Sequence, residues 1–373
     1  MIYFLVHPDA ANYQWDVVPL AEGLEALGKP FFGSANYWRK PDGTYLIRKS
    51  DDIDPLGADA VVVSTGYLNW TRENGVIEQG ALPQWMNEGR AKKARFVAMD
   101  VCDGYLSSVI HRWGGRFDVV LRSHFNARIS WPSNVRPWAF GLSNRMIEYG
   151  KRYGKSWFDR EGCIFAFGAS HGYEHTARER ASELYLSCIH SRMPVFRAQD
   201  DLTLPPGDEI ERDIWQQCAR RHSAKFFARV GKAKLCATFC GDLVPGLPWS
   251  PDYLVGGKKA ALKRSVWAAL SRLAGSKPRN IQADSWRFWE TLACGAIAIN
   301  FDADESGWKL PAQPQPGVHY LATSLCRGEK HLGEALCDDS LLHDIAQQGS
   351  AWAMREYAPA AVAARLLDIV AKK

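Results

Sequence analysis

Short apolar runs alternate with stretches of helical spacing in the first part of the chain. Four runs have the length and composition of buried strands, at residues 2–6, 60–64, 96–99 and 117–121. Asp16 precedes Val17, Leu20 and Leu24 at helical spacing, and residues 84–93 have the pattern of another helix. Strands that alternate with helices predict a parallel sheet covered on both faces.

A second alternating series follows a segment rich in Pro, Ser, Asn and Trp at residues 131–144, which we interpret as the crossing out of the first domain. Thr176 and Glu179 form a capping box ahead of a helix, and Pro359 suits the first position of a terminal helix. The expected strands of this series are residues 163–167, 195–196, 235–239, 296–301 and 318–322.

The pattern therefore predicts an α/β protein with two Rossmann-like domains that face a cleft. We expect an N-terminal domain at residues 1–150 and a C-terminal domain at 151–345. The remaining residues, 346–373, are expected to be helices that cross back onto the first domain.

Composition narrows the class of protein. The 373 residues are 46% hydrophobic and 23% charged, which suits two folded domains and argues against disorder. The net charge of +5 fits an anionic substrate and is too weak to indicate nucleic acid. Nine cysteines, an odd number, argue against a disulfide framework, and Cys236 and Cys240 have no zinc-spaced partners. The apolar start is too short for a signal peptide, so we expect a cytoplasmic protein.

The most informative motif is DSWRFWETLACGAIAINFD at residues 284–302. Ser285 is a candidate N-cap, and Gly295 stands where a helix end favours positive φ. A helix N-terminus aimed into a cleft suits phosphate. Arg287 adds a two-pronged donor for a diphosphate, and Glu290 lies one turn further on, where it can accept hydrogen bonds from sugar hydroxyls.

This motif, together with AKLCATFCGD at residues 233–242, resembles the donor-binding region of GT-B-type glycosyltransferases, closest to the exostosin-like and spore-maturation-like groups. The resemblance implies that Arg287 contacts a donor diphosphate and Glu290 its ribose, with Ser285 and Trp286 beside them. It implies a nucleotide-sugar donor domain at 151–345 and an acceptor domain at 1–150. Many retaining members carry a second glutamate where this chain has Gln282, so inversion and retention both stay open.

Ligands of open parallel sheets collect beyond the carboxyl ends of the strands. In the first domain that rule selects Asp100 and Asp103 as candidate general bases and His7 as the next candidate. In the second it selects Arg178 and the loop GASHG, whose Gly168, Ser170 and His171 would approach a phosphate. An ordinary tight turn explains the loop equally well.

Two further features bear on ligands. Asp302-Ala303-Asp304 has metal-ligand spacing, but the resemblance predicts no metal there, and we expect no metal and no cofactor besides the nucleotide-sugar substrate. Seven Lys or Arg and no acid lie between Tyr253 and Ala283, so residues 257–274 form either a solvated basic face or a peripheral contact with anionic lipid at the inner face of the membrane.

The sequence thus predicts a metal-independent glycosyltransferase of surface polysaccharide synthesis. Its acceptor would be a hydroxyl of a glycan or glycolipid. The alternatives are a nucleotide-sugar epimerase of the same fold and a non-catalytic carbohydrate-binding module.

Overall fold

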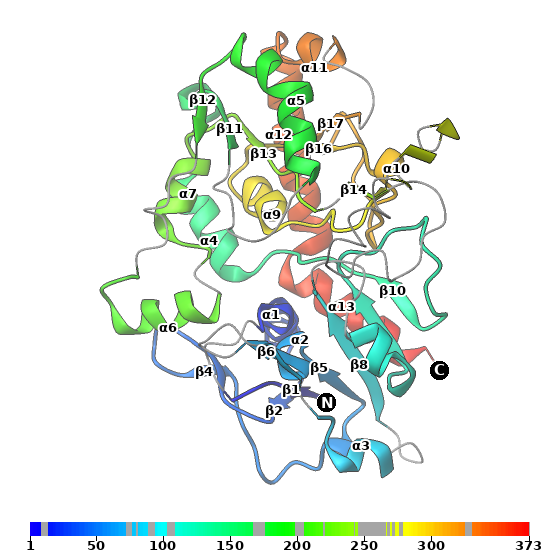
Figure 1. Ribbon diagram of the computed structural model, residues 1–373. Helices are drawn as coiled ribbons and strands as arrows, with labels where there is room; N and C mark the ends of the chain where they lie inside the picture. The colour runs from blue at the N-terminus through cyan, green and yellow to red at the C-terminus, as the bar shows by residue number, and fades with distance from the viewer. Residues whose placement is uncertain are drawn as a thin grey trace.

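Two parallel sheets, one in each half of the chain, organise the fold (Figure 1). The computed structural model describes residues 1–8, 14–71, 77–79, 81–88, 94–102, 109–166, 176–197, 205–218, 221–241, 243–244, 266, 269–270, 273–275, 279–324 and 330–372. The expected α/β class with two Rossmann-like sheets is confirmed.

The first sheet has six parallel strands in the order β10-β9-β8-β5-β1-β2. Their bounds are Ile2–Leu5 (β1), Phe31–Gly33 (β2), Ala60–Val63 (β5), Arg95–Asp100 (β8), Val119–Arg122 (β9) and Val135–Pro137 (β10). The four inner strands are the four predicted apolar runs, and their side chains are buried almost throughout, as expected for strands covered on both faces.

The two edge strands were not predicted. β10 lies inside the segment 131–144 that we interpreted as a crossing. Its Pro137 is tolerated because an edge strand does not need every backbone N–H. The chain leaves the first sheet only after this strand.

Smaller elements surround the first sheet. They are η1 (Trp15–Val17), α1 (Val18–Ala26), β3 (Tyr37–Arg39), β4 (Tyr45–Ile47), η2 (Pro55–Gly57), α2 (Thr65–Leu68), β6 (Asn69–Thr71), β7 (Ile77–Gln79), α3 (Gln84–Glu88), the π-helix η4 (Val109–Trp113) and η5 (Gly114–Arg116). Helix α1 begins with Pro19 near its N-terminus and buries most of its length.

The second sheet has five parallel strands in the order β12-β11-β13-β16-β17. Their bounds are Cys163–Ala166 (β11), Val195–Arg197 (β12), Leu235–Ala237 (β13), Ile297–Phe301 (β16) and Leu321–Thr323 (β17). All five correspond to predicted runs, although β17 begins later than expected. Cys236 and Cys240 are buried, and neither forms a disulfide bond.

Helices cover the second sheet and connect it to the first. They are α4 (Asn144–Tyr153), η6 (Trp157–Asp159), α5 (Thr176–His190), α6 (Glu209–Gln217), α7 (Ala224–Val230), α9 (Trp286–Ala293), α10 (Ala303–Ser306), α11 (Lys330–Ala335), α12 (Asp339–Tyr357) and α13 (Pro359–Ala371), with a small antiparallel pair of β14 (Leu243–Val244) and β15 (Arg279–Asn280). Gly295, after α9, has the expected positive φ of 65°.

Both sheets reverse their strand order at one point. In the first sheet the reversal lies between β1 and β5, and in the second between β11 and β13. Beyond the carboxyl ends at such a point the connections diverge, and ligands of open α/β sheets bind there.

The last two helices pack on different halves of the molecule. Trp352 of α12 stacks on Trp289 of α9, so α12 stays with the second sheet. Helix α13 packs on α1 of the first domain, where a Cβ on Gly23 would lie 2.0 Å from the Pro359 carbonyl oxygen. The crossing is therefore at Ala358 and not at residue 346, because α12 has an aromatic face that fits α9. Figure 1 shows α13 beside α1.

No helix in the described part of the chain is long and apolar enough to span a bilayer.

Candidate active site

Three arginines meet beyond the carboxyl end of the second sheet. Arg178 belongs to the first turn of α5, Arg287 to the first turn of α9, and Arg221 precedes α7. Burial, together with the positive charges of Arg178 and Arg221, lowers the pKa of Arg287 to about 10, and the negative charge of Glu290 acts in the opposite direction. We call these residues the arginine cluster. Positive charges that repel one another in this way favour the binding of an anion.

Arg178 has a fixed position within this cluster. Its Nε donates a hydrogen bond to the carbonyl oxygen of Phe239 at 3.0 Å, directly after β13. Helix α5 itself is held at the same place, because Ala177 N donates to Gly241 O. The sequence predicted Arg178 and Arg287 but not Arg221, whose only signal is its place shortly before the N-cap residue Ser223.

Glu290 lies one turn after Arg287 and is 4% exposed. Its Oε1 is 2.8 Å from Nδ1 of His222. Burial lowers the pKa of His222, with Glu290 acting in the opposite direction. The predicted sugar-binding carboxylate is thus already held by a partner that the sequence did not reveal.

The N-terminus of α9 differs in detail from the prediction. Ser285 is in the N-cap position, but its side chain makes no capping hydrogen bond. The side chain of Asp284 makes the hydrogen bonds at this helix end. Its Oδ1 accepts one from Ser285 N at 2.9 Å and one from Trp289 Nε1 at 2.8 Å. Its Oδ2 accepts from Phe140 N of the crossing segment, and burial raises the pKa of Asp284 to about 7.

Trp286 belongs to the contact between the two halves. Its ring stacks on Phe140 with centroids 4.1 Å apart and meets Trp15 edge-on at 5.6 Å. We therefore withdraw Trp286 from the predicted donor-binding set, because its ring is enclosed by aromatic neighbours.

Several predicted residues lie outside the described residues. They are Asp103 and the loop residues Gly168, Ser170 and His171. Their roles stay predictions.

The carboxyl end of the first sheet holds Asp100, which was a candidate base. Its Oδ2 is 2.9 Å from Nη1 of Arg122, and both side chains are 0% exposed. Oδ1 accepts a hydrogen bond from Cys102 N. Both carboxylate oxygens of Asp100 are thus engaged and fully buried, so neither can reach an acceptor and we withdraw Asp100 as the base.

His7 is half-buried at the point where the strand order of the first sheet reverses. Its backbone carbonyl accepts a hydrogen bond from Gln14 Nε2 at 2.9 Å. His7 therefore stands at the edge of the sheet where a base is expected, and its candidacy is unchanged.

A neighbouring carboxylate was not predicted. Asp16 accepts hydrogen bonds from Ser64 Oγ at 2.9 Å and Thr65 N at 2.8 Å. Burial raises the pKa of Asp16 to about 6. These bonds connect η1, directly before α1, to the residues that follow β5.

The Asp-x-Asp sequence has a local structural use. Asp302 caps α10, with its Oδ1 accepting from Glu305 N at 2.8 Å. Within the described ranges, no group of three or more His, Cys, Asp or Glu is arranged to hold a metal ion. Metal independence stays a prediction.

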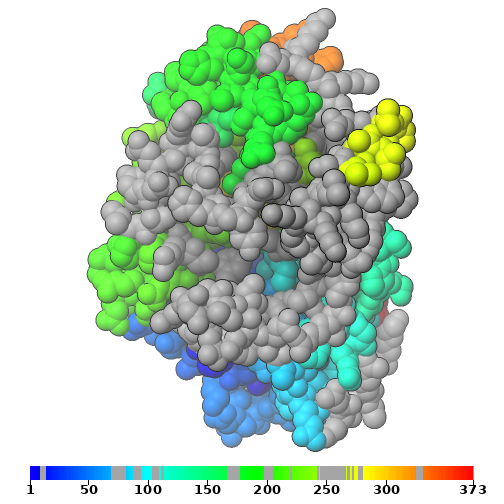
Figure 2. All heavy atoms as spheres, in the orientation of Figure 1, coloured from blue at the N-terminus to red at the C-terminus, as the bar shows by residue number. Residues whose placement is uncertain are grey.

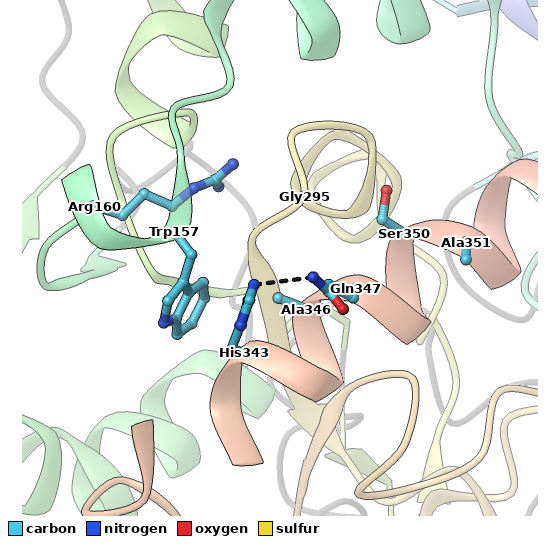
Figure 3. Close-up of a pocket in the computed structure, with 8 residues that line it drawn as sticks. All are labelled: Trp157, Arg160, Gly295, His343, Ala346, Gln347, Ser350 and Ala351. Atoms are coloured by element: carbon cyan, nitrogen blue, oxygen red, sulfur yellow. Dashed lines mark hydrogen bonds between the residues drawn. The ribbon is translucent and has the colours of Figure 1, made fainter. Parts of the chain in front are cut away.

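A pocket of about 420 Å³ lies at the opposite end of α9 (Figure 3). It is lined by Trp157 and Arg160 on one side and by His343, Gln347 and Ser350 of α12 on the other. Arg160 donates to the carbonyl oxygens of Lys155 and Cys294, and Gln347 Nε2 lies 3.1 Å from His343 Nε2. This pocket is separate from the arginine cluster, which is at the N-terminal end of α9.

No family model and no curated protein matches the chain. Among solved structures, an alpha-glucosyltransferase in complex with UDP aligns over 100% of this chain and 99% of its own, with 10% identity and a TM-score of 0.52. A glycosyltransferase from Rickettsia africae aligns over 99% and 97%, with 9% identity and a TM-score of 0.49.

The chain has the GT-B glycosyltransferase fold. At 10% identity this likeness concerns architecture alone. In the space-filling view, the blue and cyan surface of the first half lies at the bottom, and the green surface of the second half lies at the top and also at the lower left beside the blue (Figure 2). The arginine cluster belongs to the second half.

Proposed function

We propose that this protein is a glycosyltransferase that takes a sugar from a nucleoside-diphosphate donor and transfers it to a hydroxyl of a glycan or glycolipid. The single observation that supports it best is the arginine cluster at the carboxyl end of the second sheet. A diphosphate would relieve the repulsion among Arg178, Arg221 and Arg287.

The same arrangement supports the chemistry. In glycosyl transfer the bond between the sugar and the diphosphate breaks, and negative charge grows on the leaving diphosphate. Fixed guanidinium groups stabilise that charge more in the transition state than in the ground state. This role requires no metal ion, so we propose metal-independent transfer.

For the proton of the acceptor hydroxyl we propose Asp103 or His7 as the general base. Both belong to the first half, and His7 follows β1 at the reversal of strand order. A base on one domain and a leaving-group site on the other would place the acceptor in the cleft between them.

Nucleotide binding and product analysis test the proposal. A thermal-shift panel of nucleoside diphosphates and nucleotide sugars should raise the melting temperature with at least one base, because ligands that bind the native state stabilise it. UDP is the first to try, since a solved protein of this fold was captured with it. Product analysis should then show transfer to an added acceptor.

The outcomes separate the proposed function from its alternatives. A donor sugar that changes configuration without any acceptor would show an epimerase. Absence of binding across the panel would overturn the enzyme proposal and favour a carbohydrate-binding module.

A further inference from the structure

His222 combines several features that lower stability. Its φ of 54° is in the left-handed region, which is otherwise occupied, among described residues other than glycine, by Trp38. The side chain is 1% exposed, and within the described part of the chain its Nε2 has no hydrogen-bond partner. A strained backbone and an unsatisfied buried nitrogen at one residue indicate a functional constraint.

The ring of His222 is held from several sides. It stacks on Trp15 of the first half, with centroids 4.6 Å apart, and meets Trp286 edge-on at 5.1 Å. Its Nδ1 is 2.8 Å from Oε1 of Glu290. Its backbone carbonyl accepts a hydrogen bond from Arg145 Nε at 3.1 Å. Neither the ring nor the backbone can move without breaking one of these contacts.

His222 also links the parts of the proposed donor site along the chain. It follows Arg221 of the arginine cluster and precedes Ser223, whose side chain accepts from Phe226 N to cap α7. The left-handed backbone therefore sets both the direction of Arg221 and the start of α7. An ordinary turn would have used glycine or asparagine, which adopt this region at lower cost, but glycine has no ring to reach Glu290.

We infer that His222 is a positioning residue: its Nδ1–H donates to Oε1 of Glu290 and fixes this carboxylate so that Oε2 accepts a hydrogen bond from a ribose hydroxyl of the bound nucleotide. The inference rests on the proposed function. Since burial disfavours the charged imidazole, the neutral tautomer with hydrogen on Nδ1 is the one that fits this bond.

The test measures how much the ribose hydroxyls contribute to binding. The full-length protein is titrated with UDP, with 2′,3′-dideoxy-UDP and with inorganic pyrophosphate. In the wild type, UDP should bind about 10-fold more tightly than its dideoxy analogue, the size expected for a hydrogen bond to a charged group. His222→Ala and Glu290→Ala should each abolish that ratio, and the double variant should lose no more.

Conservative and control variants separate positioning from folding. His222→Asn should restore part of the ratio, because asparagine tolerates positive φ and its amide can donate to Glu290. Ser223→Ala should lower the melting temperature by loss of the α7 cap and leave the ratio unchanged. Pyrophosphate affinity reports the arginine cluster, so it should be similar in the wild type, His222→Asn and Ser223→Ala, which keep the direction of Arg221.

A His222→Ala variant that keeps the wild-type ratio would overturn the inference while leaving the proposed function intact. Wild-type protein that binds pyrophosphate but discriminates no nucleotide from its dideoxy form would also overturn it. Wild-type protein that binds no nucleoside diphosphate would overturn the proposed function and the inference with it.

Discussion

The two sheets have the same kind of topology, but the chemistry at their carboxyl ends is opposite. In the first sheet, Asp100 and Arg122 neutralise each other in full burial, and Asp16 is satisfied by Ser64 and Thr65. In the second sheet, the arginine cluster gathers positive charge that lowers the pKa of Arg287. The first edge is balanced by an ion pair and hydrogen bonds, and the second brings three guanidinium groups near the carboxylate of Glu290.

This difference shows that position relative to a strand end selects candidates and that electrostatic balance decides among them. Asp100 and Arg287 satisfy the same positional rule. Burial with a matched partner makes Asp100 part of the scaffold, whereas two cationic neighbours favour the proposed role of Arg287 in binding an anion.

The largest effect should come from breaking the balanced edge. Asp100→Ala leaves the Arg122 guanidinium buried without its partner, and we expect a loss of about 3–5 kcal/mol in the free energy of unfolding, measured by denaturant titration. Replacing both residues, as Asp100→Asn with Arg122→Met, should recover much of that loss. If Asp100→Ala unfolds at the same denaturant concentration as the wild type, the ion pair between Asp100 and Arg122 does not stabilise the fold.

Asp103→Asn tests the other aspartate that was predicted as a general base after the same strand. If Asp103 is the base, the variant should keep its donor affinity, since the proposed donor site is on the other domain, and should lose about 10²–10⁴-fold in single-turnover rate. A variant with a lower melting temperature and normal turnover would make Asp103 a structural residue, and His7 would then be the remaining base candidate.

The positive edge is tested by Arg287→Ala. Removal of one charge-assisted donor should weaken nucleoside-diphosphate binding by about 1.5–3 kcal/mol in calorimetry and affect the nucleoside much less. Arg180→Ala is the matched control, because Arg180 is on α5 near Arg178 but exposed and paired with Glu183. Equal affinities for wild type and Arg287→Ala would remove the donor assignment.

Much of the fold was predictable because its inner strands are continuous apolar runs bounded by polar residues. The prediction missed β2 and β10, because these two edge strands are short and carry little of that apolar signal. In the site, Arg178, Arg287 and Glu290 were found from a motif and from strand ends. His222 and Arg221 were not found, because their role depends on a left-handed turn and on partners that are distant in the sequence.

A smaller effect concerns the contact between the two halves. Glu22 of α1 accepts a hydrogen bond from Asn144 N at the start of α4, and burial raises the pKa of Glu22 to about 8. A carboxyl whose pKa is higher in the folded state than in the unfolded state loses its stabilising contribution as the pH rises between those two values. The free energy of unfolding should therefore fall from about pH 5 to pH 8.

Glu22→Gln should remove part of that pH dependence. At pH 8 the variant should be more stable than the wild type by on the order of 1–2 kcal/mol, and at pH 5 the two should be similar. Glu25→Gln, on the same helix but exposed beside Lys40, is the comparison and should change both values much less, because burial and not the charge of Glu25 is the main cause of the raised Glu22 pKa. A Glu22→Gln variant less stable than the wild type at both pH values would mean that the ionised carboxylate is the favoured form.

The smallest effect concerns the predicted lipid contact at residues 257–274, most of which lie outside the described residues. Val266, Leu270 and Leu273 are 50%, 45% and 85% exposed, at the spacing of one helical face. If this face lies on anionic lipid, Leu273→Ser should weaken binding to phosphatidylserine-containing vesicles by about 1 kcal/mol, or about five-fold, without changing UDP affinity.

Phe158→Ser, 80% exposed but far from the basic segment in the sequence, is the matched control. Binding to purely zwitterionic vesicles should be weak, and added salt should weaken binding to the anionic ones, because the neighbouring Lys and Arg supply the attraction. Equal vesicle binding by wild type and Leu273→Ser would leave the alternative that these residues form a solvated basic face, and the positive charge of the second half would then serve the nucleotide alone.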